Sequence, residues 1–243
     1  MTKRLFAMLV MLGVTTLGCA TETDDEAEDI GTQDDAVIDD MQDGLAKKLP
    51  ESVQILHGDG KNFCTGVLVA PKLVLGAAHC IWGNDYKIRA PFVDKEPVVK
   101  VKKTEVLSRD NSDPSSRDLG IFVLEEAIKL DQYAIPTKIG KQADDGEKFK
   151  GVAVGRKKQE RMAPLVKSKT LTIKSGKDAG YTNGLKTEYY SSGGDSGGPL
   201  FLVEDGKITH KLVGVERQPE PKKNVDWFTR IDDKSLDLIK KYK

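Results

Sequence analysis

The chain has 243 residues, of which 38% are hydrophobic, and it carries 38 basic and 38 acidic side chains. This length fits one large all-β domain or two small ones, and the hydrophobic content excludes a chain that is disordered throughout. The zero net charge hides a division: residues 22–43 hold eleven acids and no Lys or Arg, so residues 44–243 carry a net charge of +9. Because the basic clusters lack interleaved aromatic residues, we expect a solvated basic surface and no nucleic-acid partner.

Residues 1–20 predict a signal peptide, because Lys3 and Arg4 precede an apolar run over residues 5–17. That run is too short to span a bilayer. Gly18-Cys19-Ala20 suits a small-residue cleavage site, whereas the segment over residues 16–19 resembles a bacterial lipobox, in which Cys19 becomes lipidated. Both interpretations predict export from a bacterial cell, as a secreted, periplasmic or outer-surface protein. Contact with a membrane is expected only through a lipid on Cys19.

Residues 21–37 are expected to form an acidic linker or propeptide, solvated rather than folded. From residue 52 onward the pattern becomes β, with short apolar runs separated by turn residues. The expected strands of the first half are residues 53–56, 67–70, 73–76, 88–90, 98–106 and 121–124. A connection over residues 127–140 leads to a second set of strands and a closing helix, at residues 149–155, 169–174, 187–190, 200–203, 208–215 and 227–231, with the helix at 233–242.

The loop from Gly193 to Pro199 contains two pairs of glycines that bracket Asp195 and Ser196. Glycine tolerates positive φ and lets backbone N–H groups face a ligand closely. A serine hydroxyl in such a loop can attack a carbonyl, while the N–H groups of Gly194 and Ser196 hold the oxyanion that forms. Taken alone, the same loop is equally well a glycine-rich hairpin with an incidental serine.

Two further motifs favour the catalytic interpretation. The histidine of Gly76-Ala77-Ala78-His79-Cys80 can act as a general base near neutral pH. Asp118 leads directly into an apolar strand, so we expect it to be buried and to have a partner. The rival residues lie in polar or turn segments or lack flanking glycines, and they are His57, His210, Asp110, Asp113, Ser191 and Ser192.

These three motifs, in the order His, Asp, Ser, resemble the chymotrypsin (trypsin-like) serine protease family, from about Val37 to the C-terminus. The resemblance implies an all-β fold of two six-stranded Greek-key β-barrels, at about residues 38–130 and 131–243, with a C-terminal α-helix. It also implies a triad of His79, Asp118 and Ser196, an oxyanion hole formed by Gly194 and Ser196, and an acyl-enzyme intermediate. The substrates would be proteins or peptides, and neither a metal nor another cofactor is expected.

The chain has three cysteines. If Cys19 is removed or acylated, Cys64 and Cys80 remain as a pair in an oxidising compartment. They lie 16 residues apart, as in the family's histidine-loop disulfide, and the resemblance implies that they are bonded.

The resemblance also implies a zymogen. An activating protease would cut near residues 36–38, and the freed ammonium would pair with buried Asp195 and order the oxyanion loop. In the alternative interpretation, Val37-Ile38 is ordinary β sequence and Asp195 is held in another way.

The substrate pocket is the least defined part. The resemblance implies that Tyr190 lies at the pocket base, with Ser191 beside it. It places Asp226 on the pocket floor, where it would bind a basic side chain, whereas in the alternative interpretation Asp226 is an exposed turn charge. The substrate-pairing segment corresponds to Arg217-Gln218-Pro219. Two functions therefore stay open: a serine endopeptidase, and a catalytically silent trypsin-like binding module on the cell surface.

Overall fold

The computed structural model describes residues 46–58, 64–108, 113–156 and 165–243, with only the backbone described for 165–169. The predictions for the signal peptide, Cys19, the acidic linker and the cleavage near residues 36–38 lie outside these residues, as does Asp110. All described residues belong to one compact unit. Within the described part of the chain, every helix is too short or too polar to cross a membrane.

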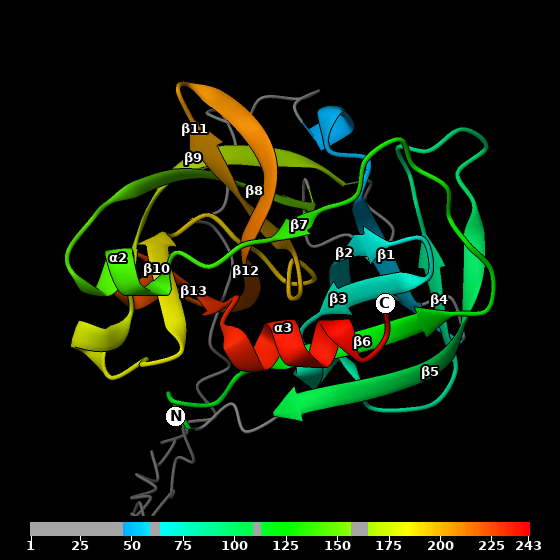
Figure 1. Ribbon diagram of the computed structural model, residues 1–243, viewed down its shortest axis with the longest axis horizontal. Helices are drawn as coiled ribbons and strands as arrows, with labels where there is room; N and C mark the ends of the chain where they lie inside the picture. Colours follow the sequence, from blue (N-terminus) through cyan, green and yellow to red (C-terminus); the bar gives the residue numbers. More distant parts are fainter. Residues whose placement is uncertain (1–45, 59–63, 109–112, 157–164) are drawn as a thin grey trace, which may run out of the picture. The chain divides into compact units, whose positions relative to one another are not determined.

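Six antiparallel strands of the first half close into a barrel in the order β1-β2-β3-β6-β5-β4 (Figure 1). A single 3-10 turn, η1 (Ala46–Lys48), precedes them, and another, η2 (Ala78–Cys80), follows β3. The strands are β1 (Ser52–His57), β2 (Cys64–Ala70), β3 (Leu73–Gly76), β4 (Tyr86–Arg89), β5 (Val98–Ser108) and β6 (Leu119–Leu124).

The second half forms a sheet in the order β11-β8-β9-β10-β13-β12, which the additional pairing of β11 with β12 closes. Its strands are β8 (Phe149–Arg156), β9 (Leu165–Ser175), β10 (Gly184–Glu188), β11 (Pro199–Glu204), β12 (Lys207–Glu220) and β13 (Val225–Arg230). The connecting strand β7 (Ile135–Pro136) adds to β12 in parallel. The remaining elements are α2 (Gly140–Asp144), η3 (Lys177–Ala179), η4 (Pro221–Lys223) and α3 (Asp233–Lys240).

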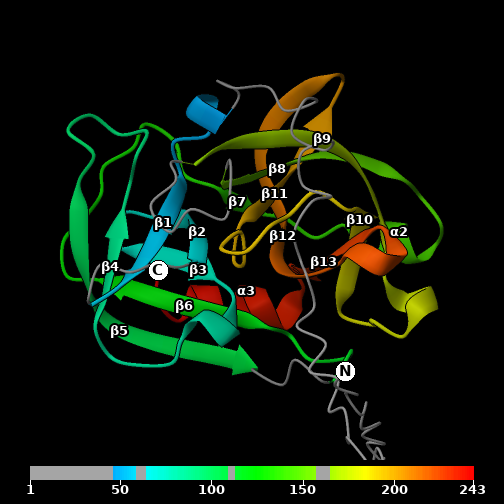
Figure 2. The same cartoon turned by 180° about the vertical axis from the view of Figure 1, so that it is seen from behind.

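Figures 1 and 2 show the two barrels side by side, and α3 lying in front of β3 and β6 in the first of these views. The predicted all-β fold of two six-stranded barrels with a C-terminal helix is therefore confirmed. One hydrophobic cluster spans both barrels, since Leu75 and Leu119 of the first pack with Val154 and Leu212 of the second. This shared core joins the barrels and fixes the edges that face each other.

Burial along the strands explains their local sequence. β2 and β3 are almost continuously apolar and buried, whereas β5 exposes Lys100, Lys102 and Lys103. Strict alternation would turn either Lys102 or Lys103 inward. A register shift between Val101 and Lys103 lets both remain exposed.

The strand predicted at residues 187–190 is displaced, because β10 ends at Glu188. The next residues leave the sheet and donate their N–H groups to a buried carboxylate: Tyr190 N and Ser191 N both bond Asp226 Oδ2. β12 extends five residues beyond its predicted end, through Glu216 and Arg217, and α2 was not predicted. A helix of five residues is too short to show a helical period.

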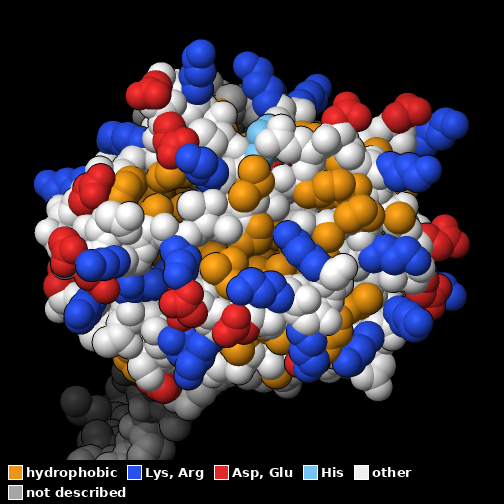
Figure 3. All heavy atoms as spheres, viewed as in Figure 1, with side chains coloured by type: hydrophobic (Ala, Val, Ile, Leu, Met, Phe, Trp, Pro, Cys, Tyr) orange, Lys and Arg blue, Asp and Glu red, His pale blue; other side chains and the backbone are white. Residues whose placement is uncertain are grey.

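The surface shown in Figure 3 carries Lys and Arg side chains over its whole extent, interspersed with Asp and Glu. On this face the basic residues do not form one continuous patch. That distribution agrees with the solvated basic surface expected from the sequence.

Candidate active site

The three motif residues come from both barrels. His79 lies on η2 directly after β3, and Asp118 directly precedes β6 in the same barrel. Ser196 lies in the loop between β10 and β11 of the second barrel. The loop is tied across the interface, since Thr65 on β2 donates through its N–H to Ser196 O at 2.9 Å and through its hydroxyl to Gly194 O at 3.0 Å.

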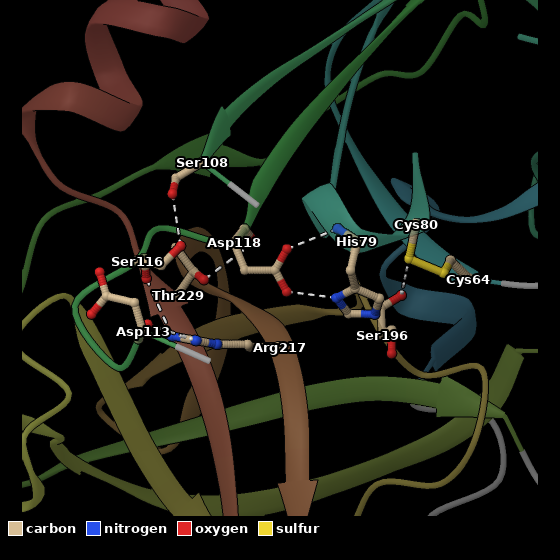
Figure 4. Close-up of polar contacts among 10 residues, drawn as sticks. All are labelled: Cys64, His79, Cys80, Ser108, Asp113, Ser116, Asp118, Ser196, Arg217 and Thr229. Carbon is tan, nitrogen blue, oxygen red and sulfur yellow. Dashed lines mark hydrogen bonds and ion pairs between the residues drawn. A yellow bond between two sulfur atoms is a disulfide. The ribbon is translucent and has the colours of Figure 1, made fainter. Parts of the chain in front are cut away.

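His79 and Asp118 are joined by two hydrogen bonds (Figure 4). The His79 Nδ1 lies 2.5 Å from Asp118 Oδ2, and the His79 backbone N–H donates to Oδ1 at 2.9 Å. Asp118 is fully buried, whereas 27% of the His79 side chain is exposed. A carboxylate can only accept, so this geometry favours the tautomer with the proton on Nδ1 and leaves the Nε2 lone pair to act as a base.

Asp118 is held in place by residues of both barrels. Its carbonyl accepts from the Thr229 hydroxyl at 3.3 Å, and it forms an isolated bridge with Ser108. The hydroxyls of Ser108 and Ser116 meet at 2.7 Å. These contacts connect the end of β5, the loop before β6 and strand β13 around one aspartate.

Arg217 holds the same loop from the second barrel. Its guanidinium donates to Ser116 O at 3.2 Å and to Asp113 O at 3.0 Å, and the residue is 3% exposed. The substrate-pairing role that the family pattern suggests for this segment stays a prediction. The long side chain of Arg217 binds the carbonyls of the loop that ends at Asp118 (Figure 4).

Ser196 lies next to the histidine segment. Its carbonyl oxygen is 3.8 Å from Cys80 Sγ, and the Cys80 sulfur is within 4.8 Å of a His79 ring nitrogen. Among the described residues, the Ser196 hydroxyl and the imidazole do not form a hydrogen bond. Such bonds are often long without substrate and tighten when it binds.

The predicted disulfide between Cys64 and Cys80 is confirmed. It ties the start of β2 to η2, and therefore holds the histidine turn against the strand that contacts the serine loop.

Glycines let the serine loop pack tightly. Gly194 and Gly197 have φ values of +99° and +85°, which side chains rarely adopt. A Cβ added at Gly197 would clash with Thr65 O. The loop folds on its own backbone through Asp195 N to Ser192 O at 3.0 Å and Gly198 N to Asp195 O at 2.7 Å.

Asp195, the residue before the serine, is fully buried. Its Oδ1 accepts from the Arg156 N–H at 2.7 Å, and its Oδ2 accepts from the Ser192 N–H at 2.9 Å. Arg156 is itself 3% exposed. Sequence reasoning missed Arg156, because it precedes Lys157 and Lys158 and therefore has the local signature of a surface cluster.

The predicted pocket residues lie together, and all are buried. Tyr190 and Ser191 are each 1% exposed, and Asp226 is fully buried. Asp226 Oδ2 accepts two backbone N–H groups at 2.7 and 2.8 Å, and Oδ1 accepts the Ser191 hydroxyl at 2.8 Å. The interpretation of Asp226 as an exposed turn charge is therefore wrong. Tyr190 packs in the barrel core with Leu200 and Phe228.

A second buried acid, Glu216, adjoins this group and was not predicted. It is 1% exposed, and its Oε1 lies 3.3 Å from the Ser191 hydroxyl. Burial, together with the carboxylates of Asp226 and Asp195, raises the pKa of Glu216 well above its ordinary value. Burial and the same acids also raise the pKa of Tyr190 well above its ordinary value. Glu216 therefore favours its protonated form more strongly than an exposed glutamate does.

The other two histidines lie elsewhere. His57 stacks on Trp82, with ring centroids 4.3 Å apart, and His210 Nδ1 lies 2.6 Å from Glu51 Oε1. Both lie in the polar or turn segments noted in the sequence, and each is partly buried.

A double β-barrel with a histidine–aspartate pair in one barrel and a Gly-Asp-Ser-Gly loop in the other defines the class of chymotrypsin-like proteins. The chain belongs to the trypsin family, since the family model described as Trypsin matches residues 41–236. It is 28% identical over 190 residues to serine protease filzig of Drosophila melanogaster, covering 64% of this chain and 11% of that protein. It is 26% identical over 238 residues to mannan-binding lectin serine protease 1 of Mus musculus, covering 75% of this chain and 33% of that protein. The chain thus spans a third or less of the length of these relatives.

Proposed function

We propose that this protein is a serine endopeptidase that hydrolyses peptide bonds through an acyl-enzyme intermediate. The observation that carries the proposal is the bond between His79 Nδ1 and Asp118 Oδ2 beside the Ser196 loop, in a chain of the trypsin family. The hydrogen-bonded pair supplies the base and its orienting acid, and the loop supplies a nucleophile flanked by glycines.

In the proposed reaction, Ser196 Oγ attacks the carbonyl carbon of the peptide bond, and its proton moves to His79 Nε2. Asp118 stabilises the imidazolium that forms. The N–H groups of Gly194 and Ser196 bind the oxyanion of the tetrahedral intermediate. The intermediate collapses, the C–N bond breaks, and the amine leaves with the proton from His79. Water, activated by His79, then hydrolyses the ester on Ser196.

The substrates would be proteins or peptides met outside the cell that makes the protease. Export through residues 1–20, with or without a lipid on Cys19, is part of this proposal and rests on the sequence pattern. The buried carboxylate of Asp226 already accepts three hydrogen bonds. We therefore do not propose a preference for basic side chains at the cleaved bond.

The second candidate function is a trypsin-like module that binds a partner without hydrolysis. One observation favours it: Tyr190, at the expected pocket base, is 1% exposed and packed in the core, which supports a pocket with no room for a substrate side chain.

A fluorophosphonate probe separates the two functions, because it reacts only with an activated serine. We expect stoichiometric labelling of the exported protein at Ser196, with loss of label and of peptide hydrolysis in Ser196→Ala and His79→Ala. Ser115→Ala, which removes an exposed serine from the loop before β6, is the matched control and should label fully. A folded protein that takes up no label would support the binding module.

A further inference from the structure

The buried carboxylate of Asp195 needs a positive partner, because an unpaired charge in a protein interior is strongly unfavourable. In the family this chain resembles, the partner is an ammonium freed by cleavage. The described residues contain a second source of positive charge next to the same carboxylate.

Arg156, the last residue of β8, meets the oxyanion loop at two points. Its backbone N–H donates to Asp195 Oδ1 at 2.7 Å. Its guanidinium lies directly under Gly194, where an added Cβ would be 2.7 Å from Nη1. Its Nη2 donates to Cys64 O at 2.9 Å, so the side chain is anchored on β2 of the other barrel.

The charge of Arg156 persists in this site. Burial lowers the pKa of the guanidinium, and the carboxylate of Asp195 acts in the opposite direction and raises it. An arginine starts from so high a pKa that it stays protonated even when buried. Arg156 thus brings a positive charge to the loop that carries the buried carboxylate of Asp195, within the second barrel.

We propose that Arg156 is the permanent counter-charge of Asp195 and positions the oxyanion loop from within the folded chain. Arg156 is a positioning residue, since it acts through Asp195 and Gly194 rather than on the substrate. Cleavage near residues 36–38 is then not needed to build the site, and the protease is active with its acidic leader attached. This inference rests on the proposed function, and it adds how the protease becomes active.

The first test uses exported protein whose N-terminus, upstream of residue 36, is verified by mass spectrometry. We expect this uncut chain to label with the fluorophosphonate and to hydrolyse peptides at the rate of a sample cut at residues 36–38. An inert uncut chain that becomes active on cutting would overturn the inference while leaving the proposed function intact.

The second test removes the charge. In Arg156→Met we expect kcat to fall about 100-fold with little change in KM, because removal of one oxyanion donor has an effect of that order. Arg156→Lys keeps the charge and should recover most of the rate. Arg89→Met, which removes a partly exposed arginine that pairs with Glu96, is the control and should act as wild type. A folded Arg156→Met with wild-type kcat would contradict the inference.

A third readout does not depend on catalysis. Hydrogen exchange of the Asp195, Gly197 and Gly198 amides reports the order of the loop, and it can be measured in the Ser196→Ala background. We expect Arg156→Met to lower protection at these amides at least tenfold, and Arg156→Lys to retain it. Unchanged protection in Arg156→Met would overturn the positioning role whether or not the protein proves to be a protease.

Discussion

Asp118 shows how much one side chain does in this site. Both of its oxygens bond His79, one through the ring and one through the backbone, and its own carbonyl is held by Thr229. The aspartate therefore sets the tautomer of the imidazole as well as its direction. An amide in its place keeps the shape of the side chain but offers a donor where an acceptor is required.

We predict that Asp118→Asn lowers kcat by about 10⁴-fold, because the imidazole then carries its proton on the wrong nitrogen. Steady-state hydrolysis of a peptide amide measures the effect. Asp113→Asn, in the exposed part of the same loop, serves as the control and should stay within about twofold of wild type. A rate for Asp118→Asn within tenfold of wild type would contradict the role assigned to Asp118.

Glu216 governs a pH dependence of stability. Burial, then Asp226 and Asp195, raise its pKa in the folded protein, opposed by the Ser191 hydrogen bond. The folded state therefore binds a proton that the unfolded state loses first, as pH rises past the ordinary value of 4.5. Stability from this group is complete below that pH and is lost as pH rises toward the folded-state pKa, at up to about 1.4 kcal/mol per pH unit.

Glu216→Gln imitates the neutral acid, so we predict that it removes this loss and makes the protein more stable than wild type at neutral pH. Urea unfolding at several pH values between 4 and 8 gives the slopes. The exposed Glu126→Gln is the matched control and should retain the wild-type slope. Parallel curves for Glu216→Gln and wild type would show that Glu216 does not titrate in this way.

The residues that could be predicted from sequence are those with a local signature. His79, Asp118 and Ser196 each stand in a motif with flanking small or apolar residues. Arg156 and Glu216 have no such signature, because charged residues are usually exposed. Their partners are distant in sequence and meet them only in the folded chain. Asp195 lies 39 positions from Arg156, and Ser191 lies 25 positions from Glu216.

At the scale of elements, strand β12 acts on the loop before β6. Arg217 extends from β12 and binds the carbonyls of Asp113 and Ser116, two residues before Asp118 in the second case. A planar guanidinium can hold two carbonyls at once, which the ammonium of lysine does less well. The strand and the loop belong to different barrels, so this contact fixes the acid of one barrel from the other.

We predict that Arg217→Met lowers kcat by about 10- to 100-fold, because a displacement of about 1 Å in a catalytic group has effects of this size. The kcat of Arg217→Lys should lie between those of wild type and Arg217→Met. Lys207→Met, on the exposed end of β12, should be unchanged. Hydrolysis kinetics measure kcat, and limited proteolysis at residues 113–116 measures how well the loop is protected. An Arg217→Met variant with full activity and a protected loop would exclude the clamp.

The strands follow the apolar runs, so most of the fold could be predicted at this scale. The β2–β3 hairpin matches because Pro71-Lys72 marks its turn, and β3 matches residue for residue. β10 was misplaced because Tyr190 is buried in the core without belonging to a strand, and its N–H donates to Asp226 rather than to a neighbouring strand. The register shift in β5 could not be predicted from the sequence either, since it depends on pairing with β6.

At the scale of the whole folded unit, the site depends on the contact between two barrels. Thr65 bonds the serine loop, and Arg156 bonds Cys64. Glu51 of the first barrel forms a hydrogen bond with His210 of the second. Burial raises the pKa of Glu51, and the histidine partly offsets this rise. Only the motif resemblance predicts two barrels, because hydrophobic periodicity predicts strands but not how the sheets close.

Helix α3 is a further link between the barrels. Its cap residue, Asp232, accepts from Ser235 N through Oδ1 at 2.9 Å and pairs through Oδ2 with Arg117 at 2.5 Å. Arg117 immediately precedes Asp118, so one carboxylate both caps the C-terminal helix and holds the loop that ends at Asp118. Burial raises the pKa of Asp232, whereas the Ser235 and Arg117 hydrogen bonds lower it, with a net lowering.

We predict that Asp232→Ala destabilises the protein by about 1–2 kcal/mol, as loss of a helix cap does, and also lowers kcat because Arg117 is released. Asp232→Asn keeps a capping oxygen but loses the charge, so it should retain most of the stability while sharing part of the kcat loss. Since the folded-state pKa of Asp232 is lowered, its contribution is present at neutral pH and disappears as pH falls through that pKa. Urea unfolding at pH 7 and pH 3 therefore should show the difference between wild type and Asp232→Ala shrinking with acid. A difference that persists at pH 3 would assign the effect to packing of the helix rather than to the charge that joins it to the first barrel.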